Sequence, residues 1–342
     1  MAESGSDGRQ RKAFVTGGTG FVGSHLVEEL LRRGYGEVRC LVRSRQKWLQ
    51  PLDITPVRGD LSDAEVLWEA VRDVDLVYHV AGLTRAPDWD RFYQANVRAT
   101  LNLLGAVKMA NPDVERVLVT SSLAAVGRCE DTVATEDAPL RPISPYGRSK
   151  AEMEQALRDP HTMRTPYMED LPITIVRPPA VYGPRDRDIL TFFQAVNKGV
   201  CPVVDGGRDP ELSLVHVRDL VRGMVEAAES DVTAGETYFL GSEAIYAWND
   251  VKAATLEALD SWALTVPVPG ALVGAVGAAA EAWGRLTGSY PPLNREKARE
   301  IRHACKACAI DKAQRDFGYA PKISLHEGVR ETIRWYEDEG WL

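Results

Sequence analysis

The feature that most constrains the fold is a glycine-rich turn close to the N-terminus. Residues 13–15 form a short apolar run that predicts a buried strand, and apolar residues at helical spacing follow the turn as far as Gly34. A strand, a tight turn and a helix in this order present the unpaired N–H groups and the positive dipole end of a helix to a phosphate. The pattern predicts a dinucleotide site. Its candidate cofactor-binding residues are Gly17, Thr19, Gly20, Phe21, Val22 and Gly23.

The segments that follow alternate between strand and helix patterns as far as Pro184. Such alternation predicts an α/β fold of the Rossmann type, a doubly wound parallel sheet with helices on both faces. After Pro184 the alternation weakens, which predicts a smaller, mostly C-terminal substrate-binding lobe. Apolar runs predict further strands at 38–42, 74–80, 116–120 and 173–176, and helical spacing occurs near 63–72, 92–109 and 148–158.

These patterns also predict a division of the chain into parts. We expect a mobile tail over residues 1–11, which are polar. The dinucleotide-binding domain is expected at 12–184, with residues 213–241 returning to it. The substrate-binding lobe is expected to comprise residues 185–212 and 242–342.

Charge and hydropathy restrict the partners and the location. The chain has 41 Lys and Arg against 49 Asp and Glu, a formal net charge of −8, which argues against nucleic acid as a partner. The polar residues 1–12 do not match a secretory signal. Residues 263–280 carry no charge but include several Pro and Gly, so we expect a buried small-residue helix over a hydrophobic pocket rather than a membrane span. We therefore expect a cytoplasmic protein without membrane association.

The chain has five Cys, an odd number that favours reduced thiols in a reducing compartment over a disulfide scaffold. His303, Cys305 and Cys308 lie within six residues of one another. A structural zinc site needs four ligands, and no second pair of Cys or His stands nearby, so we predict no metal site.

A cation occupies the position that selects between the two nicotinamide cofactors. The residue about 20 positions after the third glycine contacts the adenosine ribose, and here it is Arg43. An acidic residue suits NAD, whereas a guanidinium suits the 2′-phosphate of NADP. We predict NADP(H), with NAD as the alternative. The other interpretation is that Arg43 is an ordinary solvated cation at the end of a strand.

A phenol and an ammonium are placed one helical turn apart. Tyr146 and Lys150 are four residues apart and so share a helix face. The pKa of a free Tyr is about 10, and a nearby ammonium lowers it. Such a Tyr can exchange a proton with a carbonyl or an alcohol. Ser121 and Ser122 end the preceding strand, where a hydroxyl could bind the same substrate oxygen. The Tyr/Lys spacing alone is also common on ordinary surface helices.

In combination, these features resemble an extended short-chain dehydrogenase/reductase of the NAD-dependent epimerase/dehydratase superfamily, over nearly the whole chain. The similarity is greatest to the branch of dihydroflavonol reductase and 3β-hydroxysteroid dehydrogenase-like enzymes. Besides the glycine turn, Tyr146 and Lys150, it is carried by Gly59-Asp60-Leu61, His79-Val80-Ala81-Gly82, Asn96-Val97, Ser121-Ser122 and residues 177–184 and 215–220.

The resemblance implies catalytic roles. Tyr146 would be the acid–base, Lys150 would bind the nicotinamide ribose and tune Tyr146, and Ser122 would hold the substrate oxygen, with Ser121 as the alternative. His79 and His216 would be structural residues.

The resemblance also implies cofactor contacts and an assembly. Asp60 would bind the adenine amine, and the wall of the nicotinamide site would come from residues 178–181. The helices at 93–109 and 146–158 would pair with those of a second copy, giving a homodimer through a four-helix bundle. Further cofactor contacts would come from Leu61, Ala81, Gly82, Asn96, Pro178 and Val181.

Two departures from the sugar-nucleotide members favour a reductase. Those members carry Phe-Asn where this chain has Pro178-Pro179, and an Arg four residues before the His at 216, where this chain has Leu212. Without these groups, a diphosphate would lack charge-assisted hydrogen bonds. Trp248, Trp262 and Trp283 add apolar bulk to the lobe, although each could equally be a core residue.

We therefore predict hydride transfer between the nicotinamide and a carbonyl or secondary alcohol of an apolar cyclic, sterol- or flavonoid-like, or aldehyde substrate. The alternative is an NAD-dependent nucleotide-sugar epimerase or dehydratase. A dinucleotide-sensing subunit without chemistry would not need Tyr146, Lys150 and Ser122.

Overall fold

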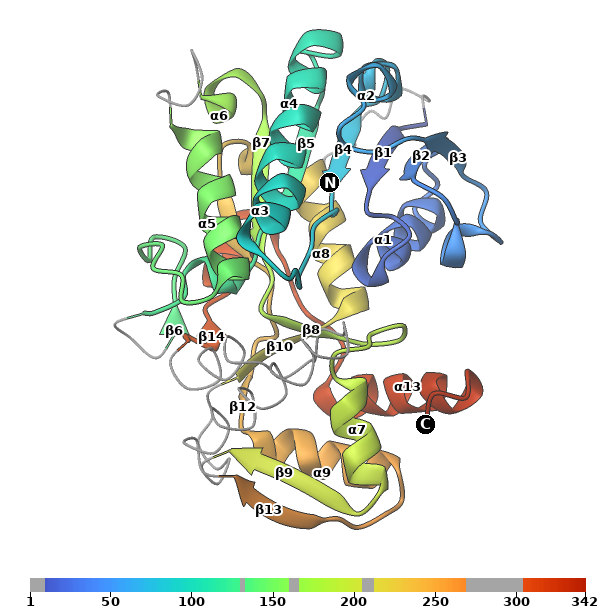
Figure 1. The fold of residues 1–342 in the computed structure, drawn as a ribbon, viewed down its shortest axis with the longest axis vertical. Helices are drawn as coiled ribbons and strands as arrows, with labels where there is room; N and C mark the ends of the chain where they lie inside the picture. Colours follow the sequence, from blue (N-terminus) through green and yellow to red (C-terminus); the bar gives the residue numbers. More distant parts are fainter. Residues whose placement is uncertain (1–9, 130–132, 160–165, 205–211, 269–303) are drawn as a thin grey trace, which may run out of the picture.

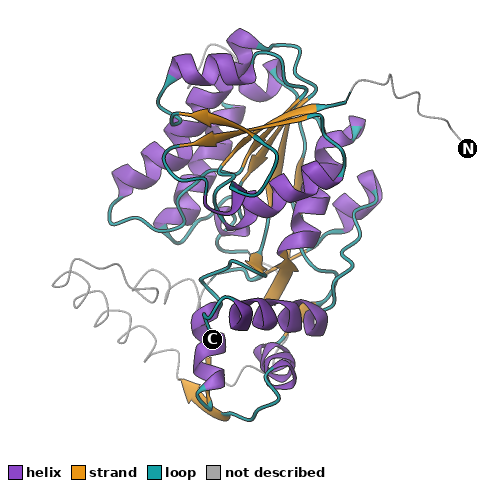
Figure 2. Ribbon diagram, turned by 90° about the vertical axis from the view of Figure 1, so that its right-hand side faces the viewer, coloured by secondary structure: helices purple, strands orange, loops and turns teal. Residues whose placement is uncertain are grey.

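The computed structural model describes residues 10–129, 133–159, 166–204, 212–268 and 304–342. Its larger part is a parallel sheet of seven strands with helices on both sides (Figures 1 and 2). The strands are β1 (Lys12–Thr16), β2 (Glu37–Val42), β3 (Thr55–Arg58), β4 (Leu76–His79), β5 (Arg116–Thr120), β7 (Ile173–Arg177) and β11 (Thr237–Phe239).

The strand order is β3-β2-β1-β4-β5-β7-β11. The chain therefore reverses its direction of progress between β1 and β4, the switch point at which sheets of this kind bind ligands. The order and the parallel pairing confirm the predicted doubly wound α/β fold. The five predicted strands agree with β1, β2, β4, β5 and β7 to within two residues at each end.

Alternating side chains of the strands build one core on each face of the sheet. In β1, the side chains of Ala13 and Val15 belong to one core and that of Phe14 to the other, and all three are fully buried. The first face is covered by α1 (Phe21–Arg32), α8 (Val217–Glu229) and α12 (Asp311–Phe317). The second face is covered by α2 (Ala64–Val71), α4 (Ala99–Ala110) and α5 (Pro145–Arg158).

The predicted helix at 92–109 is three segments instead of one. A short helix α3 (Trp89–Phe92) leads into a π-helical segment (Tyr93–Arg98), and α4 begins at Ala99. Wider turns of this kind occur frequently at functional sites. Here the π-helical segment carries the candidate residue Asn96, which is fully buried.

A smaller lobe follows the carboxyl edge of the large sheet. β8 (Ala180–Tyr182) begins only two residues after β7 and pairs with β10 (Leu212–His216), which also pairs with β12 (Ile245–Tyr246). A second pair is formed by β9 (Val200–Val204) and β13 (Leu264–Val268). Three helices pack around a separate apolar core in this lobe (Figure 1): α7 (Leu190–Asn197), α9 (Trp248–Ala258) and α13 (Leu325–Asp338).

The C-terminal stretch contributes to the core under α1 and α8 and to the core of the smaller lobe. The predicted division of the chain into domains remains a prediction. Ala313 and Tyr319 belong to the core under α1 and α8, whereas Leu325 and Val329 belong to the core of the smaller lobe. The short helix α6 (Tyr167–Asp170) packs beside α5.

The uncharged stretch at 263–280 is only partly described. Its beginning forms β13, and the predicted small-residue helix falls on residues that lie outside the described ones. No helix in the described part of the chain is long and apolar enough to cross a membrane.

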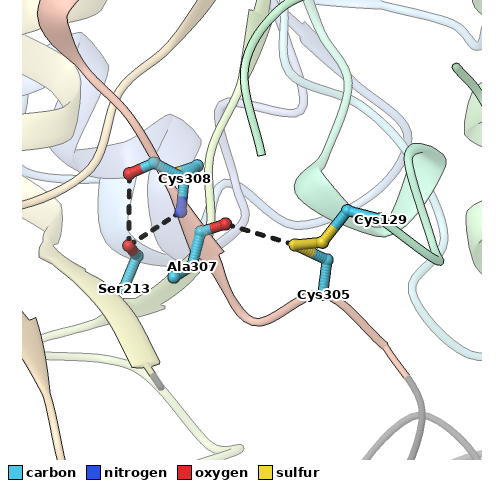
Figure 3. The surroundings of a disulfide bond; sticks show 5 residues. All are labelled: Cys129, Ser213, Cys305, Ala307 and Cys308. Carbon is cyan, nitrogen blue, oxygen red and sulfur yellow. Dashed lines mark hydrogen bonds between the residues drawn. A yellow bond between two sulfur atoms is a disulfide. The ribbon is translucent and has the colours of Figure 1, made fainter. Parts of the chain in front are cut away.

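The prediction that all cysteines are reduced is wrong. Cys129, which follows the candidate Ser122 by seven residues, forms a disulfide with Cys305, and their Cα atoms are 5.5 Å apart (Figure 3). Their separation of 176 residues gave no local signal from which the pairing could be predicted. Cys305 precedes β14 (Ala307–Cys308), which pairs with β6 (Val133–Ala134) and so brings the two cysteines together. Cys40, Cys201 and Cys308 are buried free thiols.

This disulfide is expected to stabilise the fold, because it closes a long loop in the unfolded chain. The double substitution Cys129→Ala/Cys305→Ala should lower the free energy of unfolding by about 2–4 kcal/mol. Chemical denaturation measures the difference. As the control, a reducing agent should destabilise the natural chain and leave the double variant unchanged. An equal response of both proteins would contradict the disulfide.

Candidate active site

Two positions of the glycine turn exclude any side chain, one because the turn lies against the end of β4 and the other because the turn folds closely on itself. Gly17 has a φ of +77°, and a Cβ there would lie 2.6 Å from the backbone N of Ala81. A Cβ at Gly23 would lie 2.1 Å from the carbonyl oxygen of Gly17. The turn is closed by a hydrogen bond of 2.9 Å from the N–H of Gly20 to the same oxygen. This cradle fits a bound pyrophosphate, which needs close approach of the backbone.

The first turn of α1 suits an anion. Gly20 is the N-cap residue and offers no side-chain oxygen, and the first turn contains no acidic side chain. The N–H groups of this turn therefore remain available to phosphate oxygens. The structure brings the predicted residues Thr19, Phe21 and Val22 to this position, each only half-buried.

The predicted adenosine end carries two exposed, opposite charges beyond the ends of β2 and β3. Hydrogen bonds from the hydroxyl and the N–H of Ser62 hold the pKa of Asp60 below its usual value, and the charge of Arg43 adds to the effect. Both Arg43 and Asp60 are exposed. The main-chain oxygen of Leu61 accepts a hydrogen bond of 2.9 Å from Asn102, which fixes this loop on α4.

The loop after Arg43 is attached to the smaller lobe by aromatic contacts that the sequence analysis did not find. Trp48 lies in a short 3₁₀ segment (Lys47–Leu49), and its ring centroid is 5.6 Å from that of Trp335 in α13. The guanidinium of Arg185 lies 5.1 Å from the Trp48 ring, a cation–π contact. Arg185 also donates hydrogen bonds of 3.0 Å to Ser24 and 2.6 Å to Glu28, both on α1.

The predicted nicotinamide end is built around the ammonium of Lys150. Lys150 is buried, and its Nζ donates a hydrogen bond of 2.7 Å to the carbonyl oxygen of Thr120 at the end of β5. A Cβ at Gly82 would lie 3.3 Å from this Nζ and 3.1 Å from Oδ1 of Asn96. The structure thus brings the candidate residues Gly82, Asn96 and Lys150 together from three different segments.

Two further observations fit a polar ligand at this end. Burial lowers the pKa of Lys150 to about 8, an effect that the charge of Glu154 partly offsets. The hydroxyl oxygen of Thr120 is buried without a hydrogen-bond partner in the described part of the chain. A buried polar atom of this kind is costly unless a ligand or water satisfies it.

Tyr146 lies in the first turn of α5, which begins next to Ser122. Ser144 caps the helix by accepting a hydrogen bond of 3.1 Å from the N–H of Gly147, and Pro145 occupies the first helical position. A Cβ at Gly147 would lie 2.2 Å from the carbonyl oxygen of Ala124, so α5 packs tightly on the segment (Leu123–Ala125) that Ser122 caps. The Tyr146 ring is half-buried, 6.5 Å from that of Phe92.

The two candidate serines have different surroundings. The hydroxyl of Ser121 is buried and donates a hydrogen bond of 2.6 Å to the carboxylate of Glu154. The hydroxyl of Ser122 is half-buried and accepts a hydrogen bond of 3.1 Å from the N–H of Ala124. The proton of Ser121 is therefore already committed, which favours Ser122 as the group that meets a substrate.

The predicted wall residues flank the same region. Pro178 is buried, and its carbonyl oxygen accepts a hydrogen bond of 2.9 Å from the N–H of Leu123, next to Ser122. Val181 is half-buried in β8 and packs against the core under α1 and α8.

The two histidines of the family-like segments are structural, as predicted. His79 is buried and is held between the hydroxyls of Thr16, at 2.7 Å from Nδ1, and Thr100, at 2.8 Å from Nε2. Burial lowers the pKa of His79 to about 3, so it is neutral at pH 7. His216 is buried and caps α8 through its Nδ1. No group of three potential metal ligands occurs among the described residues.

Comparison with known proteins decides the family. The model of the NAD dependent epimerase/dehydratase family matches residues 13–241, which is more than half of the chain. The chain belongs to the NAD-dependent epimerase/dehydratase family. The resemblance to extended short-chain dehydrogenases/reductases is thereby confirmed, and the chain is an enzyme of that NAD(P)-dependent group.

Several relatives match almost end to end. A ceramide reductase from Caulobacter vibrioides is 30% identical over 96% of this chain and 95% of its own length. A 2-alkyl-3-oxoalkanoate reductase from Stenotrophomonas maltophilia is 28% identical over 93% of this chain and 97% of its own. The crystal structure of DesIV, a dTDP-glucose 4,6-dehydratase from Streptomyces venezuelae with NAD and TYD bound, has a TM-score of 0.75 at 28% identity, over 96% of this chain and 98% of that one.

The lowered pKa of Lys150 predicts a pH dependence of stability. Between pH about 8 and the pKa of an ordinary Lys near 10.4, the unfolded chain holds a proton that the folded chain has lost, so this group makes stability rise with pH. Relative to the natural chain, Lys150→Met should therefore be most stable below pH about 8 and lose that relative gain as pH rises. Denaturation across this pH range measures the difference, and a difference independent of pH would contradict the burial of the ammonium.

Proposed function

We propose that this enzyme is an NADP(H)-dependent oxidoreductase that transfers a hydride between the nicotinamide and a carbonyl or secondary alcohol of an apolar substrate. The observation that carries the proposal is a buried ammonium held at the end of β5, with a serine two residues beyond that strand and a tyrosine one turn before the ammonium on the same helix. Lys150 reaches Thr120, Ser122 follows two residues later, and Tyr146 lies one turn before Lys150.

In this mechanism the chain's residues handle the proton. Ser122 donates a hydrogen bond to the substrate oxygen, and Tyr146 gives its proton to that oxygen as a carbonyl is reduced. The ammonium of Lys150 stabilises the negative charge left on Tyr146. When bound, the nicotinamide supplies the hydride to the carbonyl carbon. In the direction of oxidation, Tyr146 accepts the proton from the alcohol.

The cofactor would be held by residues already placed along the carboxyl edge of the sheet. The cradle at Gly17 and Gly23 and the first turn of α1 suit the pyrophosphate, Asp60 suits the adenine amine, and Arg43 suits a 2′-phosphate. The buried ammonium of Lys150 would bind the hydroxyls of the nicotinamide ribose.

The names of similar proteins support an apolar carbonyl substrate. The relatives include a ceramide reductase and a 2-alkyl-3-oxoalkanoate reductase, whose names denote reduction of compounds with alkyl chains. Within the predicted range of sterol-like, flavonoid-like and aldehyde substrates, these names favour a lipophilic one. Pro178 and Pro179, both buried, offer no side-chain donor to a diphosphate.

A second candidate function is that of an NAD-dependent nucleotide-sugar epimerase or dehydratase. The likeness in fold to DesIV, which binds NAD and TYD, favours it. That reaction would use the same Tyr146, Lys150 and Ser122 but would return the cofactor to its starting state in each turnover. Net consumption of NADPH with a carbonyl substrate supports the reductase, whereas product formed without net change of a co-purified NAD supports the alternative.

We further propose that the enzyme is a homodimer, joined through α4 and α5, and that it acts in the cytoplasm on a small-molecule substrate, without nucleic acid as a partner. Met109, near the end of α4, is 81% exposed in the single chain, as expected for a residue near such an interface. A disulfide such as that between Cys129 and Cys305 is unusual in a reducing cytoplasm. The redox state of these two cysteines in the cell therefore tests the proposed location.

Tyr146→Phe tests the proton transfer, because it removes only the hydroxyl. We expect kcat for reduction of long-chain ketones and aldehydes to fall by about 100- to 10,000-fold, with little change in NADPH affinity. The loss of nicotinamide absorbance measures kcat, and protein fluorescence measures cofactor binding. Tyr93→Phe, on the neighbouring π-helical segment, is the matched control. An active Tyr146→Phe variant would refute the mechanism.

Arg43→Ala tests the preference for NADP(H). Loss of a charge-assisted hydrogen bond worth about 1.5–3 kcal/mol should raise the Kd for NADPH by about 10- to 100-fold and leave that for NADH nearly unchanged. Titration of both cofactors measures the change, with the exposed Arg72→Ala as the control. Equal weakening of both cofactors would show that Arg43 does not bind the 2′-phosphate.

A further inference from the structure

A buried cluster of charges lies directly behind the candidate active site. Glu154 of α5 is fully buried, one turn after Lys150. Its two carboxylate oxygens accept hydrogen bonds of 2.9 Å and 2.7 Å from Nε and Nη2 of Arg177, the last residue of β7. The hydroxyl of Ser121 donates a third, of 2.6 Å, and Nη1 of Arg158 a fourth, of 3.0 Å.

Two of the three residues that bind Glu154, namely Ser121 and Arg177, are chain neighbours of candidate site residues. Ser121 lies between Thr120, which accepts the hydrogen bond from Lys150, and Ser122. Arg177 precedes Pro178 of the proposed nicotinamide wall. The cluster therefore joins the three elements that carry the site, namely β5, β7 and α5, at the positions where the site begins.

Stability does not explain why charges are used here. An apolar cluster of equal size is often as stable as a buried ion pair, because removing charges from water is costly. Hydrogen bonds, in contrast, fix direction as well as distance, and a bidentate pair between a guanidinium and a carboxylate fixes both planes. The arrangement thus sets the rotation and the position of α5 relative to the two strand ends.

The cluster also sets the electrostatic surroundings of Lys150. Glu154 is the acidic group that acts on the ammonium, and its charge opposes the effect of burial on the pKa of Lys150. The other elements packed around Lys150 present His79 from β4, which is neutral, and the uncharged Thr120, Gly82 and Asn96. The cations Arg177 and Arg158 both bind the carboxylate of Glu154, and Nη1 of Arg177 also donates a hydrogen bond to the carbonyl oxygen of Glu136.

We propose that Glu154 is a positioning residue for the reaction: clamped by Arg177 and Ser121, it holds Lys150 and Tyr146 in register with Ser122 and keeps Lys150 charged. This inference rests on the proposed function, because it assigns the residue that prepares the proton-transfer groups. In this role Glu154 contacts neither substrate nor cofactor. Its charge acts on the protonation of Lys150, and the length of its side chain sets the position of α5.

Two substitutions separate the charge from the length. Glu154→Gln keeps the shape and removes the charge, so the alkaline limb of kcat/KM, expected near pH 8 in the natural enzyme, should move to lower pH by at least about 1 pH unit. Glu154→Asp keeps the charge and shortens the side chain, so kcat should fall by about 10-fold or more while the alkaline limb stays in place. The matched control is Glu152→Gln on the same helix, which removes a surface ion pair with Arg148 and should change neither.

The pKa of Lys150 can also be followed without turnover, by NMR titration of isotope-labelled lysine in the natural enzyme and in each variant. A Glu154→Gln variant that is less stable but keeps the natural pH profile and the natural Lys150 titration would overturn the proposal and leave a purely structural role. If Glu154→Gln does not fold, Glu154→Asp decides: an unchanged kcat, or an alkaline limb that moves, overturns it.

Failure of the proposed function would look different. In that case the natural enzyme would consume no NADPH with any carbonyl compound, or Tyr146→Phe would keep full activity. Failure of the inference on Glu154 requires an active natural enzyme that depends on Tyr146 and whose pH profile does not respond to Glu154→Gln.

Discussion

The close contact between the glycine turn and the end of β4 is the constraint on which the rest of this structure depends. With no room for a Cβ at Gly17, the backbone of the turn lies directly on the end of β4 at the switch point of the sheet. With no room for a Cβ at Gly23, α1 starts close against the same turn. Every other candidate group is positioned from that point along the carboxyl edge, because the strands are parallel and end together. Arg43 and Asp60 lie beyond β2 and β3 on one side. Lys150 reaches the end of β5 on the other.

The two sides of this edge differ in their physical character. On the proposed adenosine side the charged groups Arg43 and Asp60 are exposed, which suits recognition of a phosphate that also keeps contact with water. On the proposed nicotinamide side the ammonium of Lys150 is buried and donates a hydrogen bond to the end of β5. Burial makes each charge interact more strongly with its neighbours. A group that must stabilise charge during a reaction benefits from burial, because burial strengthens its electrostatic interactions. A group that only binds the cofactor does not need to be buried.

The sequence allowed prediction of the features that depend on local patterns. Such local patterns encode the glycine turn, the alternating strands and helices, and the pair Tyr146 and Lys150. The glycine turn and Lys150 both lie at the carboxyl edge of the sheet. The missed features need contacts between distant segments. The edge strand β3 contains Pro56 and is largely exposed, so it has no apolar run, and the π-helical turn at Asn96 follows an ordinary helical pattern. Neither the disulfide of Cys129 nor the cluster around Glu154 leaves a periodic signal, because their partners lie on other elements.

At the connection between the two lobes, contacts between distant segments offset the cost of a strained backbone at Arg185. Arg185, directly after the segment that crosses into the smaller lobe, has a φ of +74°, a conformation that costs a residue other than glycine about 1–3 kcal/mol. Its side chain binds Ser24 and Glu28 on α1 and packs on Trp48, which in turn contacts Trp335 of α13. The strained backbone is therefore held directly by contacts to the larger part and is connected to the smaller lobe through Trp48. Because Trp48 follows the loop that carries Arg43, the same contacts connect the proposed adenosine end of the cofactor site with the lobe that would receive the substrate.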